Sequence, residues 1–255
     1  MAKAFSSVVL LYLLFNQAIA STNWSDLQRQ LPEMNVKQLE SAELSLQFLR
    51  EESARANAKG TVVIFPDQQQ HALSPKLLNT LRLHLPNLGW HLLIMPAPDA
   101  VMHTSSDSNN SEQKIQQQKN QLMARWQLLN QQAQLQAPVV IIAQGEIAAL
   151  INILIAENLA ASPQALINLG AYLPDYQQNM QMVKHLAVTP QPLLDLITAQ
   201  DHPYAIRTSE QRLVAARLQK NPLYRQRFLS EAYLNQPNQQ WLLKEIIGWL
   251  NTTGF

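Results

Sequence analysis

The clearest pattern in the chain is a short apolar run followed by a tight turn and an apolar helix. Residues 138–157 read PVVIIAQGEIAALINILIAE. The β-branched residues at 139–142 are typical of a strand that is buried inside a parallel sheet. Small residues in the turn at 143–145 allow a sharp change of direction, and apolar residues then recur at helical intervals. The pattern predicts a central strand, a sharp turn and a helix.

Similar apolar runs and amphipathic segments alternate on both sides of this unit. A chain in which strands alternate with helices folds into a mostly parallel sheet with right-handed crossovers and helices on both faces. We therefore predict an α/β fold with about six strands. The predicted strands are 61–65, 90–95, 139–142, 165–169 and 192–199, and 224–233 could form an edge strand. The predicted helices are 74–86, 111–136, 146–157, 176–185, 207–220 and 236–250, of which 111–136 has a glutamine-rich polar face.

The segment 35–57 is assigned to a helix, because its apolar residues have a roughly helical spacing with charged residues between them. These apolar residues are Val36, Leu39, Leu44, Leu46, Phe48 and Leu49. We expect residues 21–59 to form a helical segment that packs on the core, and residues 60–255 to form an α/β-hydrolase-like domain. A chain of 255 residues with 47% hydrophobic content can bury one such core.

The first twenty residues have the form of a secretory signal peptide. Lys3 supplies a positive charge, an apolar run extends from Val8 to Phe15, and small residues surround Ile19 at a cleavage site. The apolar run is shorter than the about 20 residues that a membrane span needs, although an uncleaved anchor is the alternative. We predict cleavage after Ala20 and export to a bacterial periplasm, which the absence of cysteine suits.

Charge and motif content exclude several functions. Removing Lys3 with the leader leaves 18 basic and 18 acidic residues, so the net charge falls from +1 to 0. A neutral chain argues against nucleic acid or an anionic membrane as the main partner. The chain has no cysteine, no histidine pair at metal-ligand spacing, and no phosphate-binding or dinucleotide-binding motif. We therefore expect no metal and no cofactor, a small molecule or an envelope component as partner, and no stable membrane span after cleavage.

Three sequence blocks carry a resemblance to a known family. They are residues 60–67, residues 81–90 leading to Met95-Pro96, and the turn 143–145 together with 248–250. Together they resemble a family of uncharacterised, exported bacterial proteins with an α/β-hydrolase-like fold, a domain of unknown function. The resemblance covers nearly all of the mature chain and implies the fold and the export route, but no substrate. The family's Gly-x-Gly at the turn is Ala-Gln-Gly here.

The predicted turn is where α/β-hydrolases present a nucleophilic serine, in the pattern G-x-S-x-G. The matching residues 143–147 are AQGEI, so the serine position is Gly145. Glu146 follows, and we expect its carboxylate to meet the N-terminal dipole of the helix. Asp201, after the penultimate core strand, has the usual place of the triad acid, but residues 229–239 contain no histidine. Two of the three triad members are therefore missing.

These gaps lead us to predict a non-catalytic α/β-hydrolase-fold protein of the periplasm with a binding or envelope-associated role. The alternative is an esterase-like hydrolase with a non-standard site at the carboxyl edge of the sheet, where such folds bind ligands. The alternative predicts that Asp67, His71, Asp201 and His202 converge around a pocket. We assign no catalytic residue, and Ser74 and Ser209 are explained by their places at helix N-termini. The candidate binding residues are Asp67, His71, Gln144, Gly145, Glu146, Asp201 and His202.

Overall fold

The computed structural model describes most of the chain after residue 34. The described residues are 27, 29, 35–42, 44–68, 70, 73–74, 77–97, 108–157, 159–229 and 236–255. The predicted signal peptide and the candidate His71 lie outside the described residues.

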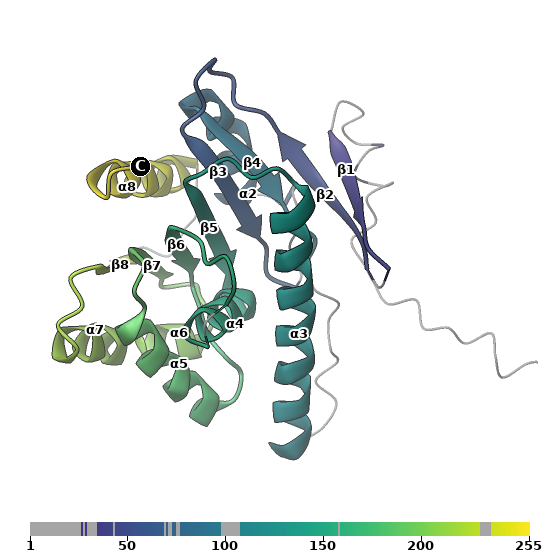
Figure 1. Ribbon diagram of the computed structural model, residues 1–255. Coiled ribbons are helices and arrows are strands. Elements are labelled where there is room, and N and C mark those ends of the chain that lie inside the picture. Colours follow the sequence, from purple (N-terminus) through teal and green to yellow (C-terminus); the bar gives the residue numbers. More distant parts are fainter. Residues whose placement is uncertain are drawn as a thin grey trace, which may run out of the picture.

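In the described part of the chain, eight strands form one sheet, in the order β1-β2-β4-β3-β5-β6-β7-β8 (Figure 1). β2 pairs antiparallel with β1 and with β4, and the other neighbouring pairs are parallel. The mostly parallel sheet is therefore confirmed. The strands are β1 (Val36–Glu40), β2 (Ser45–Glu51), β3 (Gly60–Phe65), β4 (Trp90–Ile94), β5 (Val139–Gln144), β6 (Ala165–Leu169), β7 (Leu193–Thr198) and β8 (Tyr224–Leu229).

Helices cover both faces of this sheet. The helices are α2 (Leu77–His84), the 3-10 helix η1 (Pro86–Leu88), α3 (Ser108–Gln132), α4 (Gly145–Ala156), α5 (Tyr176–Val188), α6 (Pro203–Arg207), α7 (Ser209–Leu218) and α8 (Gln236–Thr252). The predicted helix 207–220 corresponds to α7, and the short helix α6, which was not predicted, immediately precedes it. Among the described residues, every helix is too short or too polar to cross a bilayer.

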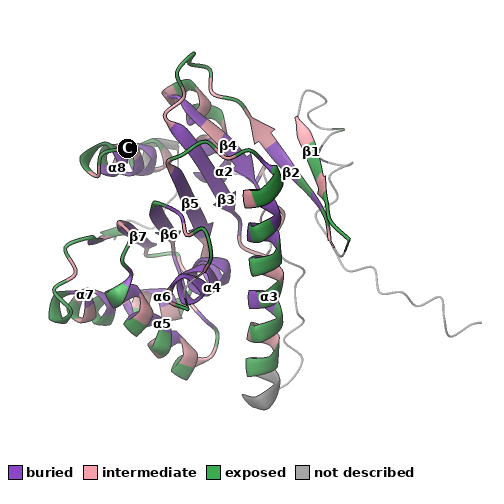
Figure 2. Ribbon diagram, viewed as in Figure 1, coloured by how far each residue is buried: buried purple, intermediate pink, exposed green. Residues whose placement is uncertain are grey.

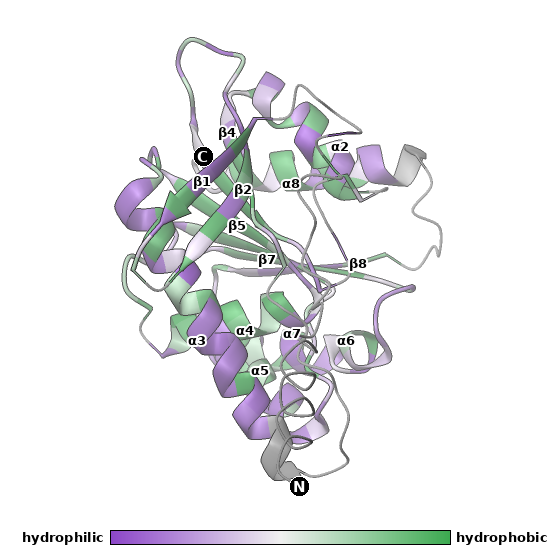
Figure 3. Ribbon diagram, turned by 90° about the vertical axis from the view of Figure 1, so that its right-hand side faces the viewer, coloured by the Kyte–Doolittle hydropathy of each residue, from purple (hydrophilic) through white to green (hydrophobic). Residues whose placement is uncertain are grey.

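Two apolar layers follow from the alternation of side chains along the strands. Val63 and Ile141 face α3, α4 and α5, whereas Val62 and Ile142 face α2 and α8. All six residues of β3 are buried, which explains why the strand is a continuous apolar run (Figure 2). The glutamine-rich helix α3 presents hydrophilic residues outward, as its sequence predicts (Figure 3).

The helix predicted over residues 35–57 is wrong, because residues 36–51 contain the antiparallel strands β1 and β2. Leu46 and Phe48 are buried in the core while Ser45 and Gln47 are exposed, which is the two-residue period of a strand. Leu49 is also buried, on the opposite face, so the apolar positions imitate a helical spacing. The division of the chain at residues 20 and 59 stays a prediction.

Candidate active site

A cavity of about 410 Å³ lies at the carboxyl ends of β3, β5, β6 and β7. This edge is where parallel α/β sheets bind their ligands. Polar residues from the loops after these strands form one part of its lining, and leucines form another. The leucines are Leu77 and Leu78 of α2, Leu169 of β6, Leu196 of β7 and Leu242 of α8.

The sharp turn between β5 and α4 forms part of this cavity and confirms the prediction for residues 138–157. β5 lies between β3 and β6, ends at Gln144, and leads directly into α4 at Gly145. Gly145 has φ of +53°, in the left-handed region that residues with a Cβ rarely adopt. Glycine adopts this conformation without strain, at the position where a hydrolase presents its nucleophile on a strained turn.

The carboxylate of Asp67 fills the space next to Gly145. The register of β3 and β5 pairs Phe65 with Ala143, so two residues further along Asp67 comes level with Gly145. A Cβ atom built on Gly145 would lie 2.2 Å from Oδ2 of Asp67 and 2.5 Å from its Cγ. Gly145 has no side chain, but the carboxylate of Asp67, from the end of the neighbouring strand β3, occupies the space beside it.

Two backbone N–H groups hold the Asp67 carboxylate. The N–H of Gln68 donates to Oδ1 at 2.9 Å, and the N–H of Glu146 also donates to the carboxylate. In α/β-hydrolases, the residue after the nucleophile and the loop after β3 supply the N–H groups of the oxyanion hole. The Asp67 carboxylate therefore accepts hydrogen bonds from the backbone N–H groups that would otherwise stabilise an oxyanion. Burial raises the pKa of Asp67, and the two N–H bonds act in the opposite direction.

A second carboxyl group, that of Asp201, lies against Gly170 in the same way that Asp67 lies against Gly145. A Cβ atom built on Gly170, whose φ is +62°, would lie 2.6 Å from Cγ of Asp201. The N–H of Thr198 donates to Oδ2 of Asp201 at 2.7 Å. Because Gln144 and Leu169 are register partners, the glycines that follow them are roughly one strand spacing, about 5 Å, apart. The cavity thus receives two carboxyl groups from neighbouring strand ends.

The surroundings of Asp201 also disfavour its anion. Burial raises the pKa of the Asp201 carboxyl, the hydrogen bonds of Thr198 lower it, and the nearby Asp195 raises it again. Arg212 opposes this last effect, but its guanidinium is paired with Asp195 itself. Burial is therefore the dominant influence on Asp201, as it is on Asp67.

A stacked aromatic pair forms another part of the wall. The rings of Tyr172 and His202 are parallel within 6°, with centroids 4.0 Å apart. Nδ1 of His202 accepts the N–H of Tyr204 at 3.2 Å, so the ring proton of the neutral imidazole lies on Nε2. Burial lowers the pKa of His202, which keeps the ring neutral near pH 7.

Glu146 lies behind this aromatic pair in the first turn of α4, as expected for a carboxylate at a helix N-terminus. The hydroxyl of Tyr172 donates to Oε1 of Glu146 at 3.3 Å. Burial and the negative charges of Glu146 and Asp67 raise the pKa of Tyr172, so its hydroxyl keeps its proton. Glu146 therefore positions Tyr172.

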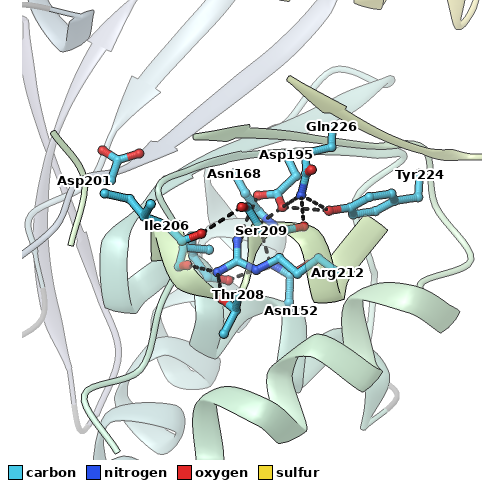
Figure 4. Close-up of polar contacts among 12 residues, drawn as sticks. Asn152, Asn168, Asp195, Asp201, Ile206, Thr208, Ser209, Arg212, Tyr224 and Gln226 are labelled. Atoms are coloured by element: carbon cyan, nitrogen blue, oxygen red, sulfur yellow. Dashed lines mark hydrogen bonds and ion pairs between the residues drawn. The ribbon is translucent and has the colours of Figure 1, made fainter. Parts of the chain in front are cut away.

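A buried polar network supports the loop after β6 (Figure 4). The fully buried Arg212 of α7 donates to both carboxylate oxygens of Asp195, at 3.3 and 3.2 Å, and to the carbonyl of Ala171. The hydroxyl of Tyr224 donates to Asp195 at 2.8 Å. Because Ala171 immediately precedes Tyr172, the network fixes the aromatic wall of the cavity.

Most of the sequence-predicted site residues meet at this cavity. Asp67, Gln144, Gly145, Asp201 and His202 line it, whereas neither Ser74 nor Ser209 does. Glu146 contacts it only through Tyr172, and His71 lies outside the described residues. Sequence reasoning missed Gly170 and Tyr172, although both follow a predicted strand at its carboxyl end.

The strand order, the sharp turn after β5 and the cavity facing that turn define the α/β-hydrolase fold class. The chain belongs to the family described as "Protein of unknown function (DUF3530)", which matches residues 19–105 and 99–252. No match was found among curated proteins.

Three solved structures with this fold are similar to the chain. A putative dienelactone hydrolase from Klebsiella pneumoniae subsp. pneumoniae has a TM-score of 0.62 and 13% identity, over 85% of this chain and 97% of that one. An esterase domain from Rhodothermus marinus has a TM-score of 0.60 and 13% identity, over 86% and 98% of the two chains. A dienelactone hydrolase from Anabaena variabilis has a TM-score of 0.59 and 14% identity, over 86% and 97%. At these identities the likeness establishes the fold.

The prediction of a non-catalytic protein is contradicted by these comparisons. The structures that share the fold are an esterase domain and dienelactone hydrolases, which favours the alternative, a hydrolase with a non-standard site. The prediction rested on the absence of a serine at the turn and of a histidine before the last helix. It did not place the carboxyl group of Asp67 beside Gly145, which Asp67 reaches from the end of β3.

Proposed function

We propose that this protein hydrolyses small carboxylic esters or lactones, with water as the attacking group and Asp67 as the general base. The observation that carries the proposal is the position of the Asp67 carboxylate, which lines the cavity beside Gly145 at the nucleophile position of the fold. The esterase and dienelactone hydrolases among the structural neighbours supply the substrate class. A cavity of about 410 Å³ suits a small substrate.

The two carboxyl groups of the cavity are suited to different roles. Asp67 accepts the backbone N–H of Gln68 in its own loop and that of Glu146 at the start of α4, and both these bonds and the helix dipole favour its anion. Burial raises the pKa of Asp201, and the charge of Asp195 raises it by more than Arg212 lowers it, whereas no acidic neighbour raises the pKa of Asp67 in addition to burial. When two carboxyl groups share a site, ionisation of one makes ionisation of the other harder. Asp67 is therefore the ionised base and Asp201 the protonated acid.

The reaction then proceeds in two steps. Asp67 takes a proton from a water molecule while the water oxygen bonds to the ester carbonyl carbon, and the carbonyl electron pair moves to its oxygen. Nε2–H of the neutral His202, which lines the cavity, can donate to that oxyanion. The tetrahedral intermediate collapses, and the leaving alkoxide takes the proton of Asp201. Transfer of the proton from Asp67 to Asp201 through solvent restores both groups, and one water is consumed for each acid and alcohol formed.

The proposal also covers the cellular location. We propose that the chain is exported to the periplasm with cleavage after Ala20, and that its partner is a small molecule or an envelope component rather than nucleic acid. The basic residue, apolar run and small residues of positions 1–20 support this route. N-terminal sequencing of the protein from a periplasmic fraction should begin at Ser21, and a chain that retains residues 1–20 in the membrane fraction would contradict it.

Hydrolysis of p-nitrophenyl acetate, p-nitrophenyl butyrate and a δ-lactone by the purified mature protein tests the activity. Asp67→Asn should lower kcat/KM by about 100-fold or more, because a general base contributes at least that factor. Glu210→Gln, at an exposed position of α7 outside the cavity, is the control and should keep the wild-type rate. Circular dichroism verifies that both variants fold. The proposal is overturned if the wild type hydrolyses none of these compounds or if Asp67→Asn is as active as the control.

A further inference from the structure

We infer that the cavity selects a cationic, amphipathic substrate, an ester or lactone whose alkyl part carries an ammonium group. This inference rests on the proposed function and adds the substrate class of the same site. It follows from the charge of the cavity, from its aromatic wall and from its leucine side.

The charged groups around the cavity are predominantly acidic. Asp67 and Asp201 line it, Glu146 lies behind Tyr172, and none of the described lining residues is lysine or arginine. Arg212 is the cation near Asp201, but it is fully buried and its charge is balanced by Asp195 at 3.2 Å. A buried anion without a counter-charge is unfavourable, so an ammonium group on the ligand would supply a positive charge that the described lining residues lack.

The aromatic wall favours the same ligand. Tyr172 and His202 are stacked, and Tyr204 contacts His202 edge-on at 5.4 Å between ring centroids. Tyr172 and His202 line the cavity, and Tyr204 and Tyr176 extend the aromatic cluster beyond the lining, with 6.5 Å between their ring centroids. Aromatic rings attract an ammonium group through their negative faces and offer nothing comparable to an anion. The neutral His202 adds no positive charge that would repel a cation.

The leucine side explains why the ligand should be amphipathic. Five leucines from α2, β6, β7 and α8 form the apolar part of the cavity lining, beside its polar residues. An alkyl segment buried against them is stabilised by about 0.8 kcal/mol per methylene group. A metal ion is a poorer fit, because no three His, Asp or Glu side chains of the described residues are grouped as metal ligands. An organic ammonium with an alkyl chain meets both requirements.

A matched series of p-nitrophenyl esters tests the selection. The acyl groups are 6-aminohexanoate, heptanoate and the monoester of heptanedioate, which place an ammonium, a methyl or a carboxylate at the same position of one chain. The wild type should prefer the ammonium ester over the methyl ester by about 10- to 100-fold in kcat/KM, and should prefer the carboxylate ester least. Glu146→Gln, which removes the negative charge next to Tyr172, should reduce the ratio between the first two esters, whereas Glu210→Gln should leave it unchanged. Equal rates for the ammonium and methyl esters would overturn the inference while leaving the proposed hydrolysis intact.

A binding measurement separates the inference from the reaction itself. Isothermal titration calorimetry with hexylammonium, hexan-1-ol and hexanoate needs no turnover. Hexylammonium should bind the wild type most tightly. Its advantage over hexan-1-ol should decrease in Asp67→Asn, which removes the ionised carboxylate of the cavity, and as the pH falls, because Asp67 is then protonated. If no ester is hydrolysed but this preference is found, the proposed function fails and the inference stands. If hexan-1-ol or hexanoate binds as tightly as hexylammonium, the inference fails.

Discussion

Gly145 and Asp67 are so close that a side chain at one position must displace the other. In Gly145→Ala the new Cβ would lie 2.2 Å from Oδ2 of Asp67, a distance that real Cβ atoms do not show. The left-handed backbone at φ +53° costs a non-glycine residue about 1–2 kcal/mol. Moving the carboxylate away from the N–H groups of Gln68 and Glu146 costs about 1.5–3 kcal/mol more, the typical value for a hydrogen bond to a charged group. Gly145→Ala should therefore lower the free energy of unfolding by about 2.5–5 kcal/mol.

Urea unfolding of a double-mutant cycle separates the two costs. In an Asp67→Ala background the clash is absent, so Gly145→Ala should cost only the about 1–2 kcal/mol of its backbone. Gly254→Ala is a matched control, because Gly254 also has a positive φ but a Cβ added to it would meet no atom within 4 Å. Its cost should resemble that of Gly145→Ala in the Asp67→Ala background. An equal cost of Gly145→Ala in both backgrounds would refute the placement of Asp67 against the turn.

Three further predictions concern the carboxyl groups and the network behind them. The rate of ester hydrolysis should show a bell-shaped dependence on pH, because it falls at low pH as Asp67 is protonated and at high pH as Asp201 ionises. Both limbs should lie above the ordinary carboxyl pKa of 3.8, and a low-pH limb centred at 3.8 would contradict the burial of Asp67. Because the folded-state pKa of Asp201 is raised, its contribution to stability is fully present below pH 3.8 and is lost as the pH rises through the folded-state pKa. Asp201→Asn should therefore show a smaller loss of unfolding free energy over this pH range in urea unfolding, and a pH dependence equal to that of the wild type would contradict the raised pKa. Tyr224→Phe removes the hydroxyl that donates to the buried Asp195 at 2.8 Å, so thermal or urea unfolding should show a loss of about 1.5–3 kcal/mol, and wild-type stability would contradict this role.

The parts of the fold that depend on local signals could be predicted from the sequence. The β-branched run at 139–142 and the small residues after it specify the strand and the sharp turn, since both preferences act within a few residues. β1 and β2 could not be recognised in this way. Their apolar residues face both sides of the sheet, and their pairing with β4 is a contact between distant parts of the chain.

The candidate site depended on information that no single segment carries. The presence of Asp67 and Asp201 at strand ends was visible in the sequence, but their contacts with two glycines were not. Asp67 meets Gly145 only because β3 is the neighbour of β5 and pairs with it in a register that sets Phe65 opposite Ala143. A shift of that register would remove the carboxylate from the turn.

Direct attack by water differs from attack by an enzyme group in two observables taken together: where the oxygen of the water is found after one turnover, and whether an acyl-enzyme forms. A single turnover of p-nitrophenyl butyrate with excess enzyme in ¹⁸O-labelled water, followed by mass spectrometry, measures the label in both the butyrate and the peptide that contains Asp67. With Asp67 as the general base, the butyrate of the first turnover should carry one ¹⁸O atom and Asp67 should carry none. Unlabelled butyrate together with ¹⁸O in Asp67, or an acyl group retained on a side chain of the protein, would contradict attack by water.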